Sequence, residues 1–408
     1  MSASIIVHRG TKQISGSCIE IRSQSGERLI LDAGRPLDAD REAVDLLPDS
    51  LDRTGSATVL ICHPHQDHWG LIHELPPAWP VLTGEGSAKL IEITSRFARQ
   101  PINRILETWP SRGSFKKGAF RITPYLTDHS GFDAYMLLIE VDGHRVLYSG
   151  DFRIHGRKSG LVERMMQSPP PAIDALILEG TNLGTDKPTI TEADLEDQFV
   201  DLAQRTQGRM FVCWSGQNID RTVTLYRAAK RLGRTLVVDL YTAEVMEAIS
   251  DSTRLPRPGF DNLKVVITRS LRNHYAGLGR DEFVGLMAKN GMGANALEGS
   301  NLIVMLRDGL IRDYKARGVV PSASDTFSYS MWKGYLDKPN EALEWMRSGG
   351  AHIEHLHTSG HASGDHLRAF AKAMNAKAII PVHGQSWDKE QSGFSAIRRL
   401  ADGELFNL

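Results

Sequence analysis

The feature that most constrains this chain is the run His63-Pro64-His65-Gln66-Asp67-His68, which directly follows the apolar segment Ala57–Cys62. The apolar segment has the length and composition of a buried strand, so the run begins where that strand opens into a loop. In extended backbone, residues i and i+2 point the same way, so the first two histidines of the run can bind one metal ion while its last two residues turn toward a second. Four ligand-type side chains in six positions are typical of a metal site rather than of a loop histidine that only accepts a hydrogen bond.

A site for two metal ions needs about six or seven nitrogen and oxygen ligands, with positions left over for water and substrate. The run supplies four ligand-type residues: His63, His65, Asp67 and His68. The remaining candidates each follow a predicted strand, where a rigid sheet can hold a side chain in place: His129, Asp151 and His383. Because imidazole nitrogen and carboxylate oxygen suit zinc, or manganese as the alternative, these residues predict a site for two such ions.

Length and composition narrow the class of protein. The chain has 408 residues, which exceeds the usual size of one hydrophobic core, so we expect two domains or one domain with a large insertion. The hydrophobic fraction of 41% and the charged fraction of 24% are ordinary for a soluble globular protein. No apolar run approaches the roughly 20 residues that span a bilayer, and the N-terminus lacks the pattern of a secretory signal. We therefore expect a cytoplasmic protein with no role in a membrane.

The cysteines and the net charge give weaker constraints. Cys18, Cys62 and Cys213 are odd in number and far apart, which suits neither a disulfide framework nor a zinc motif of paired cysteines, so we interpret them as core thiols. A formal net charge of −1 gives no general attraction to nucleic acid. A polyanionic partner would have to be bound by local basic groups or by the metal ions.

The pattern of predicted elements changes along the chain. The first third reads as short strands joined by turns, among them a hairpin whose arms flank Asp142-Gly143. From about Thr191, strand-like runs alternate with helical stretches, as in βαβ units, which predicts a second, α/β domain. After Asn340, further strand-and-loop units carry histidines in a setting like that of the first third. We therefore predict a first domain over residues 1–188, an inserted domain over 189–350, and a return to the first domain over 351–408.

Ordered motifs along nearly the whole chain resemble those of a known family. Besides residues 63–68, they are Ile14-Ser15-Gly16-Ser17-Cys18, Leu31-Asp32-Ala33-Gly34, Asp128-His129-Ser130, Gly150-Asp151-Phe152-Arg153, Leu178-Glu179-Gly180-Thr181, Ser359-Gly360-His361-Ala362 and Pro381-Val382-His383-Gly384. With these motifs the chain resembles the β-CASP branch of the metallo-β-lactamase superfamily, which includes ribonuclease J and the cleavage-and-polyadenylation endonucleases. Residues 63–68 alone are similar to the whole superfamily, lactamases and thioesterases included. The specific marks are the last two motifs and the insertion that precedes them.

The resemblance implies a fold and a division of the ligands between two ions. The fold would be an α/β protein, an αββα metallo-β-lactamase sandwich with an inserted α/β β-CASP domain. One ion would be bound by His63, His65 and His129. The other ion would be bound by Asp67, His68 and His383. Asp151 would bridge the two ions.

The resemblance also implies a catalytic set, in which Asp67 and Asp151 are joined by three residues outside the metal ligands. Asp32 would support the ligand loop from behind, and Glu179 matches the acidic residue that opens the insertion, so both would fix imidazole tautomers and loop geometry. His361 matches the histidine poised over the scissile phosphate, where it would act as a general acid or as a donor to the oxyanion. Asp32 can also be interpreted as a simple turn carboxylate, and Glu179 is similarly open.

Substrate contacts are predicted at two places. Asn218 and Arg221 lie between a predicted strand and a predicted helix, where backbone N–H groups and the helix dipole favour a phosphate. Their stretch is similar to the ribonuclease J sequence Ser-Asn-Ile-His-Arg, although Gln217 replaces the serine and Asp220 replaces the histidine. The second place is the loop Ser359-Gly360-His361.

Together these residues predict a two-metal nuclease. Two metal ions about 3.5–4 Å apart can lower the pKa of a shared water toward ~7 and neutralise charge on phosphoryl oxygens. The main hypothesis is zinc-dependent hydrolysis of phosphodiester bonds in single-stranded RNA, by endonucleolytic or 5′-exonucleolytic cleavage. In the DNA-processing relatives the position of His383 tends to be valine, so histidine here favours RNA. The oligomeric state stays open between monomer and dimer.

Three other functions stay open from the sequence. A DNA nuclease of the same fold would use the same metal site. A small-molecule hydrolase of lactones, thioesters or phosphodiesters would leave the motif at 359–362 and the insertion without an evident purpose. A non-catalytic scaffold, as occurs among eukaryotic relatives, would be expected to have lost ligands, and all seven are present.

Overall fold

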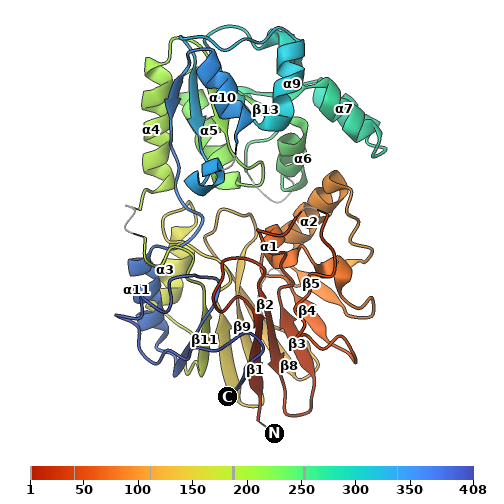
Figure 1. The fold of residues 1–408 in the computed structure, drawn as a ribbon, viewed down its shortest axis with the longest axis vertical. Coiled ribbons are helices and arrows are strands. Elements are labelled where there is room, and N and C mark those ends of the chain that lie inside the picture. Colours follow the sequence, from red (N-terminus) through yellow and green to blue (C-terminus); the bar gives the residue numbers. More distant parts are fainter. Residues whose placement is uncertain (1, 41, 111, 186–188, 251–253, 338) are drawn as a thin grey trace. The chain divides into compact units, whose positions relative to one another are not determined.

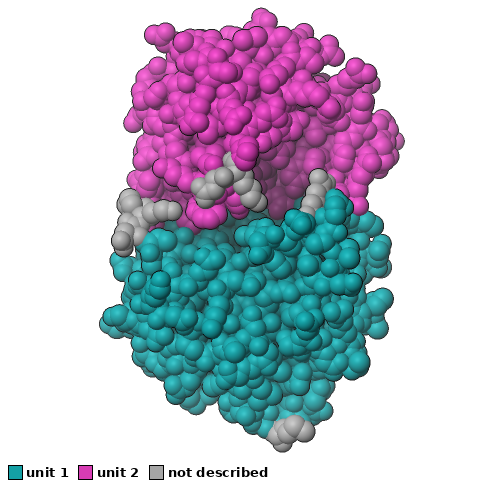
Figure 2. Space-filling model, in the orientation of Figure 1, with its two compact units in different colours: residues 1–95, 100–188, 360–408 teal, residues 96–99, 189–359 magenta. Residues whose placement is uncertain are grey.

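The computed structural model describes residues 2–40, 42–110, 112–185, 189–250, 254–337 and 339–408. The chain divides into two compact units, which Figure 2 shows in different colours. Unit 1 contains residues 1–95, 100–188 and 360–408, and unit 2 contains residues 96–99 and 189–359.

Two β-sheets form the centre of unit 1 (Figure 1). The first sheet consists of β1 (Ser4–Arg9), β2 (Cys18–Arg22), β3 (Arg28–Leu31), β4 (Thr58–Leu60), β5 (Val81–Thr83), β6 (Leu106–Thr108) and β20 (Leu405–Asn407). Its strand order is β20-β1-β2-β3-β4-β5-β6. The second sheet consists of β7 (Phe115–Lys117), β8 (Phe120–Leu126), β9 (Tyr135–Val141), β10 (His144–Tyr148), β11 (Ala175–Leu178) and β19 (Ala378–Pro381). Its strand order is β19-β11-β10-β9-β8-β7.

Successive side chains along the strands of unit 1 pack in different cores, one on each face of the sheet. In β9, Leu137 and Ile139 pack in the core that the two sheets share, whereas Met136 and Leu138 pack in a second core on the other face. Successive side chains of a strand point to opposite faces, so a strand that is covered on both faces has to be apolar at nearly every position. This explains why β9 reads as a continuous apolar run in the sequence.

Helices cover the outer faces of both sheets. On the second sheet, α3 (Ser159–Gln167) and α11 (Gly364–Met374) contribute buried apolar side chains to the core that contains Met136. On the first sheet, the corresponding layer comes from α1 (Gln66–Trp69), the 3-10 helix η1 (Ile72–Glu74) and α2 (Glu85–Ala98). The layers therefore run helix, sheet, sheet, helix, which confirms the predicted αββα sandwich.

Unit 2 is built around a single parallel sheet. Its strands are β12 (Met210–Cys213), β13 (Thr235–Asp239), β14 (Leu263–Ile267), β15 (Gly291–Gly293), β16 (Leu302–Met305), β17 (Thr326–Tyr329) and β18 (His352–Glu354), in the order β15-β14-β13-β16-β12-β17-β18. The helices are α4 (Glu192–Arg205), α5 (Ile219–Arg231), α6 (Leu240–Ala248), α7 (Arg269–Ala276), α8 (Asp281–Ala288), α9 (Asp308–Ala316) and α10 (Glu341–Ser348), with the 3-10 helices η2 (Ala294–Ala296) and η3 (Lys333–Asp337).

The sheet of unit 2 is covered on both faces. In β12, Met210 and Val212 pack in the core that includes side chains of α4 and α5, and Phe211 and Cys213 pack in the core that includes side chains of α9 and α10. This arrangement confirms the predicted additional α/β domain, because strands and helices alternate along this part of the chain. Among the helices of the described residues, none has both the length and the apolar composition required to cross a membrane.

The limits of unit 2 differ from the predicted insertion in two places. β18 pairs in parallel with β17, so residues 351–359 belong to unit 2 and the chain returns to unit 1 at Gly360 rather than at residue 351. Residues 96–99 also belong to unit 2, where the ring of Phe97 lies 4.6 Å from that of Tyr241. Contacts between segments that are far apart in the sequence set both limits, and local sequence patterns do not reveal such contacts. The predicted boundary after residue 188 falls at residues 186–188, which lie outside the described residues.

The loop that follows β3 packs directly on the run 63–68. The backbone N–H of Ala33 donates to the carbonyl of His68 at 2.8 Å, and the N–H of Arg35 donates to the carbonyl of Gln66 at 3.0 Å. Between them, a Cβ added at Gly34 would lie 1.7 Å from the carbonyl oxygen of Asp67. Only glycine allows the two backbones to approach this closely.

We expect Gly34→Ala to destabilise unit 1, because backbone atoms rather than a flexible side chain occupy the space that the methyl group needs. The free energy of unfolding should fall by on the order of 1–3 kcal/mol or more. Gly285→Ala is the matched control, since nothing lies within 4 Å of a Cβ added there in α8. Chemical denaturation of both variants checks this, and equal stability of the two would contradict it.

Candidate metal centre

The predicted ligands follow strands whose carboxyl ends lie at the same edge of each sheet. In the second sheet, β10, β11 and β19 are mutually parallel, and β8 runs in the same direction because β8 and β10 both pair antiparallel with β9. The ligands that follow β8, β10 and β19 are His129, Asp151 and His383. In the first sheet, β3 and β4 are parallel, and residues 63–68 follow β4. The topology therefore brings together residues that are more than 300 positions apart.

One group of ligand atoms consists of ring nitrogens from His63, His65 and His129, which all lie within 4.8 Å of one another. Nε2 of His63 and Nε2 of His129 are each 3.1 Å from Nδ1 of His65. A hydrogen bond can satisfy one such contact, whereas a metal ion accepts all three lone pairs. The geometry thus suits a nitrogen-rich metal site.

A second group consists of atoms from Asp67, His68, Asp151 and His383, also within 4.8 Å of one another. Nε2 of His68 lies 3.1 Å from Oδ2 of Asp151, and Nε2 of His383 lies 3.3 Å from Oδ2 of Asp67. Oδ2 of Asp151 is also 3.7 Å from Nε2 of His63, which belongs to the first group. Asp151 therefore lies between the two groups, as a bridging ligand would.

The donor set fits bound metal ions on two further observations. Oδ1 of Asp151 is buried and receives no hydrogen bond, which is costly for a carboxylate oxygen unless a cation is nearby. Imidazole and carboxylate are the donors that zinc accepts in hydrolytic sites. His63, His68, His129, Asp151 and His383 are buried, and His65 and Asp67 are half-buried.

The rings of His129 and His383 are each oriented by a hydrogen bond on the side that faces away from the other ligands. Nδ1 of His129 lies 2.6 Å from the carbonyl oxygen of Gly360, and Nδ1 of His383 lies 2.9 Å from Oγ1 of Thr181. With these nitrogens protonated, Nε2 of each ring keeps its lone pair for a metal ion. A Cβ at Gly360 would lie 2.5 Å from Oγ of Ser130, so glycine lets this carbonyl reach the ring.

The protonation states of three histidine ligands and of both carboxylate ligands favour cation binding. Burial lowers the pKa of His63, His65 and His129, so these rings are neutral near pH 7. Burial alone would raise the pKa of Asp67, but the hydrogen bond with His383 outweighs it and lowers the pKa to about 2. Burial is likewise outweighed at Asp151, where the neighbouring histidines hold the pKa well below its ordinary value. Neutral imidazoles and ionised carboxylates are the forms that bind metal.

His361 lies beside the ligands and is held by Glu179. Nδ1 of His361 is 3.1 Å from Oε2 of Glu179 and 3.8 Å from Oδ2 of Asp151. Burial by itself lowers the pKa of this imidazole, but Glu179 and then Asp151 outweigh it and raise the pKa to about 9. Glu179 is fixed in turn because its Oε1 accepts a hydrogen bond from the N–H of Phe152 at 3.0 Å. A protonated imidazole is therefore positioned at the edge of the ligand set.

Asp32 lies behind the ligand loop. Its Oδ2 accepts a hydrogen bond from Nδ1 of His68 at 2.8 Å, and its Oδ1 accepts one from the N–H of Cys62 at 2.8 Å. Asp32 is fully buried, and its backbone has a φ of 61°, a conformation that is rare for a residue other than glycine. Asp32 therefore contacts one of the predicted ligands directly, and its functional role stays a prediction.

Three of the five predicted substrate-contact residues do not belong to the unit that contains the predicted metal ligands. Asn218, Arg221 and Ser359 belong to unit 2. Oδ1 of Asn218 accepts from the N–H of Arg221 at 3.0 Å and so caps α5. The guanidinium of Arg221 is buried, where it donates to the carbonyl of Ser330 at 3.0 Å and pairs with Glu192 at 3.4 Å. Its burial favours a structural role, and contact with substrate stays a prediction.

The sequence did not single out Thr181, Cys62 or Tyr148 as parts of the site. Thr181 orients His383, and Cys62 and Tyr148 both contact Asp32. Thr181 was within reach of sequence reasoning because it belongs to the same motif as Glu179. Nothing local marks Cys62 or Tyr148, since each reads as the apolar end of a buried strand.

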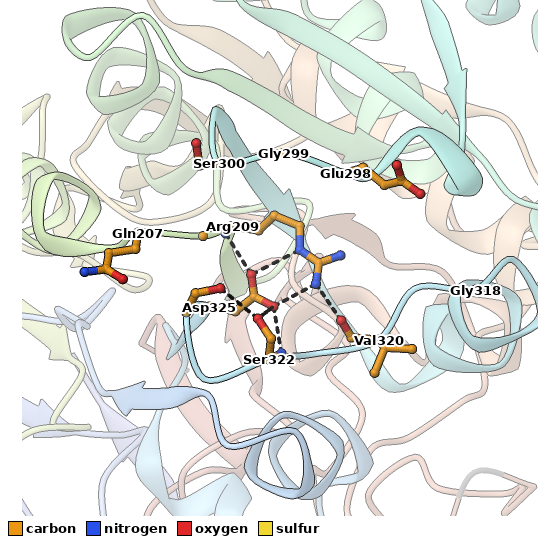
Figure 3. A pocket seen from close by; sticks show the side chains of 11 residues that line it. Gln207, Arg209, Glu298, Gly299, Ser300, Gly318, Val320, Ser322 and Asp325 are labelled. Carbon is orange, nitrogen blue, oxygen red and sulfur yellow. Dashed lines mark hydrogen bonds and ion pairs between the residues drawn. The ribbon is translucent and has the colours of Figure 1, made fainter.

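A separate cavity of about 440 Å³ lies in unit 2 (Figure 3). Its lining includes Arg209 and Asp325, which precede β12 and β17, so the cavity is at the amino edge of the parallel sheet. Ligands of such sheets bind at the opposite, carboxyl edge. Arg209 already donates to Oδ2 of Asp325 at 2.7 Å and to the carbonyl of Leu297 at 2.9 Å, which indicates a structural role.

Zinc binding near pH 7 should release protons. In the metal-free protein, burial lowers the pKa of His68, but Asp151 outweighs it and raises the pKa well above the ordinary value. A metal ion on Nε2 must then displace that proton, so zinc affinity should rise with pH until His68 is neutral. Calorimetric titration in buffers of different ionisation enthalpy checks this, and a binding enthalpy that is the same in every buffer would contradict it.

Models of two protein families match this chain. The metallo-beta-lactamase superfamily matches residues 12–193, which contain six of the seven predicted ligands. A family described as a Zn-dependent metallo-hydrolase RNA specificity domain matches residues 350–390, which contain His361 and His383. The two matches thus include every residue that the structure gathers at the metal centre, and they support a metal-dependent site.

Curated relatives include several ribonuclease J proteins. That of Sinorhizobium meliloti is 23% identical over 90% of this chain and 66% of its own length, and that of Mycobacterium tuberculosis is 24% identical over 88% of this chain and 65% of its own length. The Streptococcus pyogenes ribonuclease J 1 is 22% identical over 83% of this chain and 59% of its own length. The chain thus spans just under two thirds of the length of these relatives.

A solved structure also shows the same fold over the whole chain. The crystal structure of a protein of unknown function from Enterococcus faecalis V583 superposes with a TM-score of 0.78, covers 100% of both chains and has 16% sequence identity. The fold, the family models and the relatives agree with the resemblance seen in the sequence motifs. Together the two family models and the relatives support placing this chain in the β-CASP branch of the metallo-β-lactamase superfamily.

Proposed function

We propose that this protein is a two-zinc nuclease that hydrolyses phosphodiester bonds of single-stranded RNA. The observation that carries the proposal is the pair of donor groups with Oδ2 of Asp151 near both, because such a pair can hold two ions side by side. The ligands would be His63, His65 and His129 for one ion and Asp67, His68 and His383 for the other. Bound metal ions would supply Lewis-acid stabilisation of phosphoryl charge and a water of lowered pKa.

The protein side chains around the ligands would orient and protonate the substrate. Glu179 holds Nδ1 of His361, and the raised pKa keeps this ring protonated near pH 7. His361 would therefore donate its Nε2 proton to the leaving oxygen or to a phosphoryl oxygen. Asp32 would hold His68 in the tautomer that leaves Nε2 free, as Thr181 does for His383.

RNA is favoured as the substrate by the comparisons. The matched model of residues 350–390 describes an RNA specificity domain, and the curated relatives are ribonucleases. We also propose that unit 2 is the inserted β-CASP domain and that it contributes to binding of the RNA strand. The three buried, free cysteines support a reducing location, and we propose the cytoplasm.

Cleavage assays on labelled strands test this function. The zinc-loaded protein should cleave single-stranded RNA labelled at either end more efficiently than the matched DNA, and a chelator should abolish cleavage. Asp151→Ala should remove the activity, because both donor groups lose their shared carboxylate. RNAs with monophosphate and triphosphate 5′ ends distinguish internal from 5′-terminal cleavage. Hydrolysis of a lactone or thioester with no cleavage of any strand would overturn the proposal.

We expect His361→Ala to lower kcat for RNA by roughly 10²–10⁴-fold, the usual contribution of a positioned general acid or oxyanion donor. The zinc content should stay unchanged, because all seven proposed ligands are intact. The control is His352→Ala in unit 2, whose side chain is 58% exposed and pairs only with Glu354 among the described contacts. Loss of a zinc ion from His361→Ala would instead identify His361 as a ligand.

A further inference from the structure

Two buried side chains meet Asp32 behind the metal ligands. Oη of Tyr148, the last residue of β10, donates to Oδ2 of Asp32 at 2.6 Å, and Sγ of Cys62 lies 3.0 Å from the same oxygen. Cys62 and Tyr148 are both buried, with exposed fractions of 0% and 1%. Neither side chain is part of the proposed ligand set or the acid–base machinery.

The thiol of Cys62 also contacts the ligands themselves. Its Sγ lies 3.0 Å from Nδ1 of His63 and 3.4 Å from Nδ1 of His68. In both rings Nε2 is the atom that faces other ligands, at Asp151 and His65. The thiol therefore lies on the side of the two imidazoles that faces away from the metal positions.

One assignment of the hydrogen-bond directions satisfies all of these contacts. Asp32 is a carboxylate acceptor, so the S–H of Cys62 and the O–H of Tyr148 both donate to it. The sulfur can then accept the Nδ1–H of His63, while Asp32 accepts the Nδ1–H of His68. Each histidine is left in the tautomer whose Nε2 lone pair is available.

We propose that Cys62 and Tyr148 are positioning residues of the metal centre, which orient His63 directly and His68 through Asp32. The inference rests on the proposed metal dependence. His63 belongs to one donor group and His68 to the other, so Cys62 links the two groups on the side opposite Asp151. Tyr148 donates to the same carboxylate oxygen as His68, Oδ2 of Asp32, and so helps to hold in place the carboxylate that orients His68.

The packing around the thiol leaves room for few replacements. A Cβ added at Gly150, directly before Asp151, would lie 3.2 Å from Sγ of Cys62. Serine fits the same space and keeps one donor and one acceptor, whereas alanine removes both. Phenylalanine at position 148 keeps the ring and removes only the hydroxyl. These substitutions separate hydrogen bonding from filling of the core.

Zinc affinity is the direct measurement, because groups that hold ligands in place typically change metal affinity by 10–100-fold. We expect Cys62→Ala and Tyr148→Phe to weaken binding of zinc by about that factor in competition with a chelator, and Cys62→Ser to weaken it less. The matched controls are Cys213→Ala and Tyr314→Phe, a buried cysteine and a buried tyrosine of unit 2, whose zinc affinity should equal that of the unchanged protein.

Thermal unfolding of the metal-free proteins separates a structural role from a positioning role. Variants that unfold at a lower temperature but bind zinc like the unchanged protein would overturn the inference and leave the proposed function intact. Failure of the unchanged protein to bind zinc would overturn both. The Co²⁺-loaded protein gives an independent readout: altered visible bands in Cys62→Ala without a thiolate-to-metal band in the unchanged protein support positioning, whereas such a band would make Cys62 a ligand.

Discussion

The structure of unit 1 depends on the electrostatics of its ligand set. Five imidazoles and two carboxylates converge within a few ångströms, and one buried carboxylate oxygen of Asp151 receives no hydrogen bond. Buried polar groups of this kind are costly unless hydrogen bonds or a cation satisfy them. Divalent cations are the groups that satisfy three ring nitrogens and a shared carboxylate at once. The requirement for a metal thus follows from the arrangement as well as from the motif.

The sandwich supplies the rigidity that such an arrangement needs. The ligands follow the carboxyl ends of β4, β8, β10 and β19, and each of these strands contributes side chains to the core that the two sheets share, which fixes the ligand positions. The backbone of Gly34 approaches the ligand loop so closely that no side chain fits between them. Asp32 accepts an unfavourable left-handed conformation, and its four hydrogen-bond donors compensate for that strain.

A common feature of the site is that four of the five ligand rings have their orientation fixed on the side away from the metal positions. Asp32, Thr181 and the carbonyl of Gly360 serve His68, His383 and His129 in this way. The thiol of Cys62 occupies the equivalent position at His63. A hydrogen bond from Nδ1 of His361 to Glu179 orients that ring in the same way, but the ring of His361 is protonated instead of neutral. The same imidazole chemistry thereby serves ligand binding and proton donation.

Much of the protein could be predicted from the sequence. The run 63–68 and the strand-end positions of His129, Asp151 and His383 predicted a metal site, and the change from short strands to alternating strands and helices predicted an additional α/β domain. The αββα sandwich followed from the resemblance of the ordered motifs to the β-CASP branch. These features are local, because strand periodicity and ligand spacing are properties of neighbouring residues.

Only the tertiary structure decided which distant residues meet. The pairing of β18 with β17 assigned residues 351–359 to unit 2, and the burial of Arg221 placed a predicted substrate contact inside a hydrogen-bonded core. Cys62 and Tyr148 became part of the metal centre only because β4 and β10, in different sheets, bring them to the same carboxylate. The sequence by itself determined the fold class and the candidate ligands. The hydrogen bonds that orient those ligands depend on contacts between segments far apart in the chain, which no local pattern records.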